Sequence, residues 1–343
     1  MVIGAMPASA QTHSAVEPAA RTGRQMQRHQ SFNKIVESQK GEVDLIFIGD
    51  SITQGWEGNG RGTWEYYYGD RRAVNLGIGG DRTQHVLWRL ENGNIDGISP
   101  KLAVVMIGTN NSADDRNTAG EIVDGVQAVV GKLRSSLPDT KILLLGIFPR
   151  GSEFNNQRGK ILQVNQVIRK LSDDSMVAWL DIGHHFIDAD GRIPSTIMPD
   201  ALHLSPLGYE LWAQAIEKRL ARLLDEDPKP ARPSHASGEW TWVMDGPDGQ
   251  PVEASLNITS KKAAVNGSIA FGEFRSFTLD DGFAAGPYIA FNLTRNRPNG
   301  ESITYKMAAE IKLDGGKFLM DGSTETNLEG QKMNSPWKAS RPK

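Results

Sequence analysis

Four short polar segments, each following an apolar run or preceding an amphipathic one, carry the residues that could do chemistry in this sequence. They are Gly49-Asp50-Ser51, Gly79-Gly80, Asn110-Asn111, and Asp200 with His203. A serine hydroxyl attacks an acyl group when an imidazole takes its proton, a carboxylate orients that imidazole, and N–H donors stabilise the oxyanion. The residue types in these segments therefore indicate nucleophilic ester chemistry, with Ser51 as the candidate nucleophile.

The elements that must position these residues alternate between apolar strands and amphipathic helices. Strands are expected at 43–48, 73–76, 102–107, 142–147 and 177–180. The patterns between them are helical, with apolar residues such as Ile161, Val164 and Ile168 recurring every three or four positions. Continuous apolar strands separated by such helices predict an α/β fold, a parallel sheet covered by helices on both faces. Sites in open α/β sheets lie at the carboxyl ends of the strands, where three of the four segments begin.

A change of pattern divides the chain near residue 230. Residues 225–238, DEDPKPARPSHASG, are rich in proline and charge, as is typical of an interdomain linker. Beyond them apolar and polar residues alternate, as in 252–258 and 303–313, with glycine-containing turns between the runs. We expect a flexible N-terminus over 1–20, a catalytic domain over 21–226, a linker over 227–238 and a small antiparallel β domain over 239–343, either a sandwich or a barrel.

Composition limits the partners and the compartment. The 38 basic and 41 acidic residues form no basic stripe, so nucleic acid is not an expected partner. The absence of cysteine excludes disulfides and thiolate catalysis. No apolar run is long enough to span a membrane. Ala8-Ser9-Ala10 has the small-x-small pattern of a signal-peptidase site, so we favour export to the periplasm or the medium over a cytoplasmic location.

Four sequence blocks, in this order, resemble those of the SGNH hydrolases, also called GDSL esterases and lipases. The blocks are GDSIT, NLGIGGDRT, GTNN and PDALHLSPLGYELWA. The longer stretch NLGIGGDRTQHVLWRL is especially similar to the catalytic subunits of intracellular platelet-activating-factor acetylhydrolase and their bacterial relatives. The resemblance covers roughly residues 40–225, and four blocks in order are far more specific than any one of them.

The resemblance implies a flavodoxin-like five-stranded parallel sheet and a serine mechanism without metal or organic cofactor. By position, Ser51 would be the nucleophile, His203 the general base and Asp200 the residue that orients it. The backbone N–H groups of Ser51 and Gly80 and the side-chain amide of Asn110 would form the oxyanion hole. Asn111 departs from the Asp that the family often has, as it does in the acetylhydrolase branch.

The sequence contains fewer signals for the substrate than for the nucleophile. Short loops follow the strands, and their candidate substrate contacts are Trp56, Arg82, Asn111 and Arg150. They suit a short acyl group on a polar alcohol, so we expect a carbohydrate acetylesterase, with a short-chain phospholipid or lysophospholipid esterase as the alternative.

His184 and His185 compete with His203 for the role of base. A catalytically silent binding or scaffold protein of the same fold is the non-enzyme alternative, and aromatic residues of the β domain could contact polysaccharide.

Overall fold

The computed structural model describes residues 12–246, 249–272, 275–328 and 330–343. These residues form two compact units, which are described separately below. Unit 1 comprises the described part of 1–54 together with 68–149 and 155–183, and unit 2 comprises 55–67, 150–154 and the described part of 184–343. In this part of the chain, no helix is both long and apolar enough to cross a membrane.

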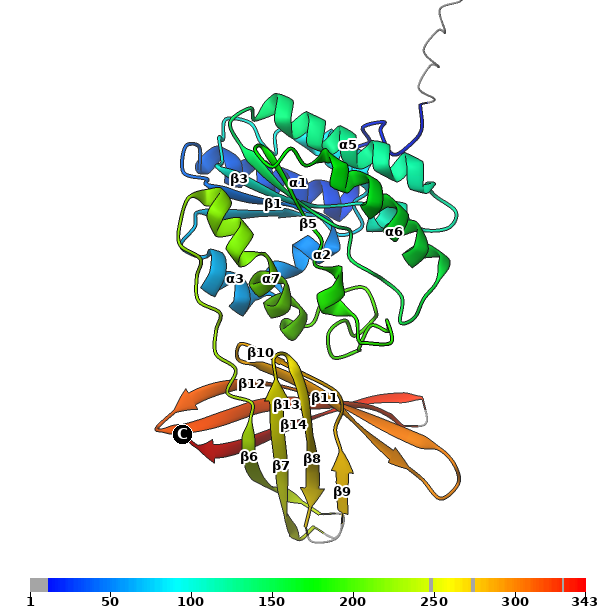
Figure 1. Cartoon of the computed structure of the whole chain (residues 1–343), viewed down its shortest axis with the longest axis vertical. Helices are drawn as coiled ribbons and strands as arrows, with labels where there is room; N and C mark the ends of the chain where they lie inside the picture. Colours follow the sequence, from blue (N-terminus) through cyan, green and yellow to red (C-terminus); the bar gives the residue numbers. More distant parts are fainter. Residues whose placement is uncertain (1–11, 247–248, 273–274, 329) are drawn as a thin grey trace, which may run out of the picture. The chain divides into compact units, whose positions relative to one another are not determined.

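Among the described residues, unit 1 is built on a sheet of five parallel strands (Figure 1). The strands are β1 (Leu45–Gly49), β2 (Ala73–Gly77), β3 (Leu102–Met106), β4 (Lys141–Leu145) and β5 (Val177–Leu180). Their order, β2-β1-β3-β4-β5, is the flavodoxin-like order, which confirms the predicted fold. The last residue of β1, Gly49, lies opposite Gly77 of β2 and Met106 of β3. The loops after these three strands therefore start at one edge of the sheet.

Helices complete unit 1. They are α1 (Gly23–Ser38), α2 (Ser51–Gln54), α4 (Thr83–Leu90), α5 (Ala119–Ser136) and α6 (Asn156–Ile168), with short 3₁₀ turns η2 (Thr109–Asn111) and η3 (Arg169–Leu171). Side chains from α1, α4, α5 and α6 share one buried core with alternate strand residues such as Ile46 and Ile48. Leu45 and Phe47, which point to the other face of the same strand, are buried too. A strand buried on both faces explains the continuous apolar runs of the sequence.

The segment before α1 packs on unit 1. The Thr83 hydroxyl donates to the carbonyl of Ala15, and the Ala19 N–H donates to the carbonyl of Gln84. The sequence interpretation placed a flexible stretch over 1–20; residues 12–20 are instead held by these contacts with α4, while residues 1–11 lie outside the described residues.

Unit 2 contains α3 (Arg61–Tyr68, whose last residue belongs to unit 1), α7 (Pro206–Leu224) and the 3₁₀ turns η1 (Gly55–Glu57) and η4 (Gly183–Phe186, whose first residue belongs to unit 1). The predicted start of α7 is confirmed: Ser205 Oγ accepts the Gly208 N–H at 3.1 Å and Pro206 is the first helical residue. Glu210, fully buried on α7, accepts a hydrogen bond from Thr63 of α3 and pairs with Arg232. The proline-rich segment that holds Arg232 thus contacts two helices, and its role as an interdomain linker stays a prediction.

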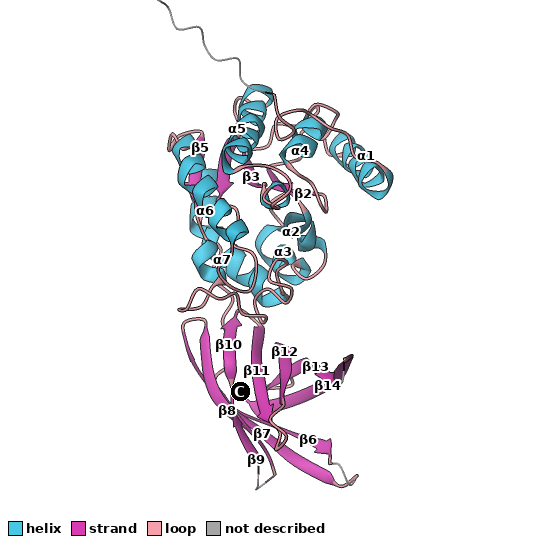
Figure 2. Ribbon diagram, turned by 90° about the vertical axis from the view of Figure 1, so that its right-hand side faces the viewer, coloured by secondary structure: helices cyan, strands magenta, loops and turns pink. Residues whose placement is uncertain are grey.

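The C-terminal part of unit 2 is an antiparallel barrel (Figure 2). Its strands are β6 (Gly238–Asp245), β7 (Pro251–Lys261), β8 (Ala264–Phe271), β9 (Arg275–Thr278), β10 (Asp280–Ala285), β11 (Tyr288–Asn296), β12 (Ser302–Asp314), β13 (Lys317–Leu328) and β14 (Gln331–Pro342). Pairing of β10 with β8, through Gly282 and Val265, closes a ring of eight described strands, and β9 pairs with β8 beside it. The sequence left a sandwich and a barrel open for this domain, and the structure shows a barrel. Trp240, Phe291 and Met320 are among the side chains that fill it.

Candidate active site

Ser51 lies at the junction where β1 ends and α2 begins. Asp50, fully buried, accepts the N–H of Ile52 at 3.0 Å and its backbone carbonyl accepts the N–H of Gln54 at 2.8 Å. Gly49 is required by space, because a Cβ at this position would lie 2.5 Å from the Met106 carbonyl oxygen. Close strand contact and an immediate helix start therefore hold the half-buried Ser51 at the carboxyl edge of the sheet.

The glycine loop after β2 lies beside Ser51. Gly79 donates its N–H to Gln54 Oε1 at 2.7 Å, and a Cβ on Gly79 would lie 3.8 Å from the Ser51 Cβ. Gly80 has φ +78°, a left-handed conformation that glycine adopts without strain. The carbonyl oxygen of Gly80 accepts a hydrogen bond from Arg21 Nη1 at 2.8 Å.

Asn110 joins the same group from the loop after β3. Its Nδ2 donates to the carbonyl oxygen of Asp81 at 3.0 Å, which ties the Asn110 amide to the residue after Gly80. The nitrogen carries a second hydrogen that this bond does not use. Within unit 1 the structure thus brings together the three residues that the sequence assigned to the oxyanion hole, Ser51, Gly80 and Asn110.

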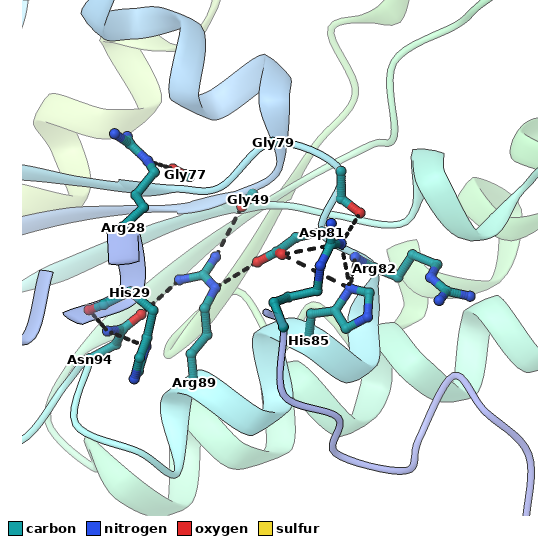
Figure 3. A network of polar contacts seen from close by, with 12 residues as sticks. Arg28, His29, Gly49, Gly77, Gly79, Asp81, Arg82, His85, Arg89 and Asn94 are labelled. Carbon is teal, nitrogen blue, oxygen red and sulfur yellow. Dashed lines mark hydrogen bonds and ion pairs between the residues drawn. The ribbon is translucent and has the colours of Figure 1, made fainter. Parts of the chain in front are cut away.

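A buried ion pair below this loop was not predicted from the sequence (Figure 3). Arg89 of α4 donates from Nε to Asp81 Oδ2 at 2.7 Å and from Nη2 to the Gly49 carbonyl at 3.0 Å. Its Nη1 donates to Asn94 Oδ1 at 3.0 Å. Both charged side chains are almost fully buried, with 2% of Arg89 and none of Asp81 exposed. One guanidinium therefore connects the loop that carries Gly80 to the end of β1, two residues before Ser51.

The electrostatics around Asp81 follow from this burial. Burial raises the pKa of Asp81, and the attraction of Arg89 and Arg21 only partly opposes the shift. His85 accepts the Arg82 N–H on Nδ1 at 3.0 Å. Burial, followed by repulsion from Arg21, Arg82 and Arg89, lowers the pKa of His85 to about 3, so the imidazole is neutral near pH 7. The only sequence signal for this network was the spacing of Asp81, His85 and Arg89, four residues apart.

Asp200 and His203 form the second candidate pair, in unit 2. Asp200 Oδ2 lies 2.7 Å from His203 Nδ1, and Oδ1 accepts the backbone N–H groups of His203 at 2.7 Å and Leu202 at 3.1 Å. Burial opposes ionisation of Asp200, but the hydrogen bonds from His203 and Leu202 outweigh it and lower the pKa of the carboxyl group. An ionised Asp200 accepts a proton-bearing Nδ1, which leaves the lone pair of the ring on Nε2.

The competing histidines have a different environment. The rings of His184 and His185 lie against each other in η4, with centroids 4.1 Å apart and ring planes tilted by 37°. Burial and the neighbouring His184 lower the pKa of His185. Asp188 and Asp190, which follow them, form ion pairs with Arg192 at 3.1 and 2.9 Å. Among the described residues neither carboxylate bonds to a histidine, so these contacts favour His203 as the oriented base.

Two of the four candidate substrate contacts lie in the interior. Trp56 is 1% exposed and packs against the rings of Trp64, Tyr209 and Trp212, at centroid distances of 4.7 to 5.9 Å. Trp56 is therefore a packing residue, and the expectation that it contacts substrate was wrong. The aromatic side chains of α3 and of α7, which is distant in the sequence, cover it.

Asn111 is also fully buried, and its assignment as a substrate contact was likewise wrong. Its Oδ1 accepts the Thr83 N–H at 3.0 Å, and its Nδ2 donates to Thr83 Oγ1, Gln84 Oε1 and Asn117 Oδ1. These bonds fix the start of α4 to the loop after β3. Arg82 and Arg150, the other two candidates, are half-buried in loops that follow β2 and β4.

Comparison with known sequences agrees with this parallel-sheet hydrolase architecture. Residues 47–211 match the sequence profile of the GDSL-like lipase/acylhydrolase family. The alpha1 subunit of platelet-activating factor acetylhydrolase IB from Rattus norvegicus is 39% identical over 225 residues, which is 65% of this chain and 93% of that protein. The human alpha2 subunit is 37% identical over 216 residues, 63% of this chain and 91% of that protein. The chain therefore belongs to the GDSL-like lipase/acylhydrolase family, and it is a carboxylic ester hydrolase.

Among the solved structures to which the chain aligns is the acetylxylan esterase Axe2 of Geobacillus stearothermophilus. It is 21% identical, the alignment covers 54% of this chain and 95% of that chain, and the TM-score is 0.44. The family match ends at residue 211, before the first strand of the barrel.

Proposed function

We propose that this hydrolase cleaves short-chain, acetyl-like esters through an acyl-enzyme on Ser51. The observation that carries the proposal is the grouping of Ser51 with the Gly79–Gly80 loop and the Asn110 amide at neighbouring strand ends. A nucleophile needs oxyanion donors beside it. The loops after β1, β2 and β3 carry the candidate nucleophile and the candidate donors.

In the proposed mechanism His203 Nε2 takes the proton of the Ser51 hydroxyl as Oγ bonds to the acyl carbon. Asp200 holds the imidazole through Nδ1 and stabilises the imidazolium that forms. The backbone N–H groups of Ser51 and Gly80 and the amide of Asn110 bind the oxyanion. His203 then protonates the leaving alcohol, and a water deprotonated by His203 releases the acid and restores Ser51.

Two features support the substrate class. The relatives reported above are named acetylhydrolases, which favours a short acyl group. Unit 2 also has an open depression of about 400 Å³ lined by Glu153, Phe154, Asp190 and Arg192. Phe154 is 74% exposed, and an aromatic face beside charged hydrogen-bonding groups suits a sugar ring. The adjoining Gly151 donates its N–H to the carbonyl of Ala201, the residue after Asp200, at 2.8 Å. We therefore place a carbohydrate acetyl ester first and a short-chain phospholipid ester second.

Hydrolysis of p-nitrophenyl esters from acetate to dodecanoate by wild type and Ser51→Ala tests the mechanism. We expect acetate hydrolysis that falls with chain length and is lost in the variant. Full activity in Ser51→Ala would remove the serine from the mechanism, and a maximum at dodecanoate would refute the short-acyl preference while keeping the serine.

Phe154→Ala tests the carbohydrate assignment. Its kcat/KM on acetylated xylo-oligosaccharide should fall severalfold through KM while p-nitrophenyl acetate hydrolysis stays unchanged. Leu162→Ala is the matched control, because Leu162 is an exposed apolar side chain of α6. Equal effects of Phe154→Ala on both substrates, or a loss confined to an acetylated phospholipid, would favour the alternative.

Export and polysaccharide contact through the barrel are further parts of this proposal. Ala8-Ser9-Ala10 lies outside the described residues, and fusion of residues 1–20 to alkaline phosphatase tests export. In the barrel Trp240 is buried, whereas Trp242 is partly exposed and packs against Trp337 at 5.7 Å. Retention of the full chain on insoluble xylan, lost in Trp242→Ala, would support polysaccharide contact, and no retention of wild type would remove it.

A further inference from the structure

Arginine side chains bond two of the three loops that carry proposed oxyanion donors, the loops of Gly80 and Asn110. Arg21 Nη1 donates to the Gly80 carbonyl at 2.8 Å, and Arg116 Nη1 donates to the Asn110 carbonyl at 2.6 Å. Arg82 lies two residues after Gly80, and in Figure 3 its side chain points away from the Asp81–Arg89 pair. These three arginines come from three separate segments, the N-terminal stretch, the loop after β2 and the loop after β3.

The positive charge of this group is not balanced by nearby carboxylates. Asp81 is already bonded to Arg89 at 2.7 Å, and its other oxygen lies 3.9 Å from Arg21. Among the described residues no carboxylate lies within ion-pair distance of Arg82 or Arg116, although Asp114 and Asp115 directly precede Arg116 in the chain. His85 accepts hydrogen bonds on Nδ1 and is neutral, so it neither adds to this charge nor offsets it.

Holding Arg82 in this place is unfavourable in the unliganded protein. Its side chain is half-buried, and its pKa is lowered by burial and then by repulsion from Arg116 and Arg21. A bound anion would relieve both effects, because it replaces lost hydration and neutralises part of the repulsion. The planar guanidinium is well suited to a carboxylate or a phosphate, which it can bind through two parallel N–H donors.

From these contacts we propose that Arg82 binds a negatively charged group of the ester substrate, a carboxylate or a phosphate, with Arg21 and Arg116 strengthening the positive field. Because Arg82 is so close in sequence to Gly80, that group lies on the part of the substrate near the reacting ester. The inference rests on the proposed function and adds the charge of the preferred substrate to it.

Three acetyl esters that share a phenyl acetate core test the inference. They are 4-acetoxybenzamide, which is neutral, 4-acetoxybenzoate, which carries a carboxylate, and 4-acetoxyphenyl phosphate. Each kcat/KM is divided by the rate of hydroxide-catalysed hydrolysis of the same ester, which removes intrinsic reactivity. We expect wild type to prefer at least one anionic ester by about tenfold at low ionic strength, as one extra charge interaction at a partly exposed site provides. The preference should lie mainly in KM and shrink at high salt.

Arg82→Gln should lower the ratio of anionic to neutral kcat/KM toward one, and Arg82→Lys should restore part of it. Arg169→Gln is the matched control, because Arg169 is an exposed arginine that precedes β5, at the amino edge of the sheet. Which ester is preferred distinguishes a carboxylated substrate from a phosphorylated one.

A wild-type ratio near one, or a preference that Arg82→Gln leaves intact, would overturn the inference. In both cases hydrolysis of the neutral ester would leave the proposed esterase function standing. If wild type hydrolyses none of the three esters, the proposed function fails and the charge preference fails with it.

Discussion

Replacing Arg89 with methionine removes one cation from the interior of unit 1 and keeps an unbranched side chain in its place. In the variant, Asp81 Oδ2 loses its partner at 2.7 Å, and the Gly49 carbonyl and Asn94 Oδ1 each lose a donor at 3.0 Å. Because Asp81 is fully buried, water cannot replace the lost bonds without opening the structure. The perturbation therefore tests whether this network supports the loops that carry Ser51 and Gly80.

The expected loss of stability is about 3–5 kcal/mol, the range for breaking one side of a buried ion pair. Asp81→Asn should also destabilise the protein, since it leaves Arg89 buried without its counter-charge. The double variant Asp81→Asn/Arg89→Met leaves neither charge behind. Its loss should be smaller than the sum of the single losses by about 2–3 kcal/mol.

A pH dependence distinguishes this electrostatic account from loss of packing. The pKa of Asp81 is raised in the folded protein, so its contribution to stability is present at low pH and is lost as the pH rises through the raised value. Removing Arg89 raises this pKa further. The gap in unfolding free energy between wild type and Arg89→Met should therefore be smaller at pH 5 than at pH 8, by about 1.4 kcal/mol per unit of additional pKa shift.

Urea unfolding followed by far-UV circular dichroism at both pH values measures these free energies for the four proteins. For hydrolysis of p-nitrophenyl acetate under folding conditions, kcat should fall while KM changes less. The reason is that loss of Arg89 displaces the Gly79–Asp81 loop, which carries a proposed oxyanion donor. Strict additivity of the two single losses, together with an equal gap at pH 5 and pH 8, would refute the coupling between Asp81 and Arg89.

Three further predictions concern neighbouring features. Asn110→Ala should lower turnover about 10²–10³-fold while the protein stays folded; unchanged turnover would exclude Asn110 from the oxyanion hole. Because His85 has a pKa of about 3 when folded and about 6.5 when unfolded, its contribution to stability is lost as the pH falls between these values. The stability difference between wild type and His85→Gln should therefore change across that window, and a constant difference would contradict the low pKa. Glu210→Ala should destabilise unit 2 by about 3–5 kcal/mol because Arg232 loses its buried partner, which thermal unfolding checks against the exposed control Glu239→Ala.

Features set by neighbours in the sequence were predictable. The five strands were found because each is a continuous apolar run, and α7 was located by Ser205 and Pro206. Asp200 and His203 are three residues apart in one turn, so their contact depends on local backbone conformation alone. The order of the blocks placed Ser51, Gly80 and Asn110 at strand ends, and the parallel sheet brings such ends to one edge.

Features that depend on distant segments were not predictable. Trp56 follows α2, a position that fits a surface loop equally well, and only the packing of α3 and α7 around it made it core. Asn111 directly follows Asn110 in the same turn, yet it points into the start of α4 while Asn110 bonds the Gly80 loop. The choice between sandwich and barrel was made by the pairing of β10 with β8, because alternation along a strand specifies which side chains point inward and not which strand lies beside it.

The sequence by itself determined the parallel α/β fold through its periodicity and the Asp200–His203 pair through a short spacing, and its four blocks indicated the hydrolase class and the candidate nucleophile through their resemblance to the SGNH hydrolases. Only the tertiary structure decided what surrounds the Gly79–Asp81 loop after β2. Arg21 bonds the Gly80 carbonyl and Arg89 bonds Asp81 in this loop, and Arg116 bonds the carbonyl of Asn110, whose side chain contacts the loop. These arginines come from the N-terminal stretch, α4 and the loop after β3. Their effect on Asp81, His85 and Arg82 arises from burial and charge at distances of a few ångströms, and those distances exist only once the chain has folded.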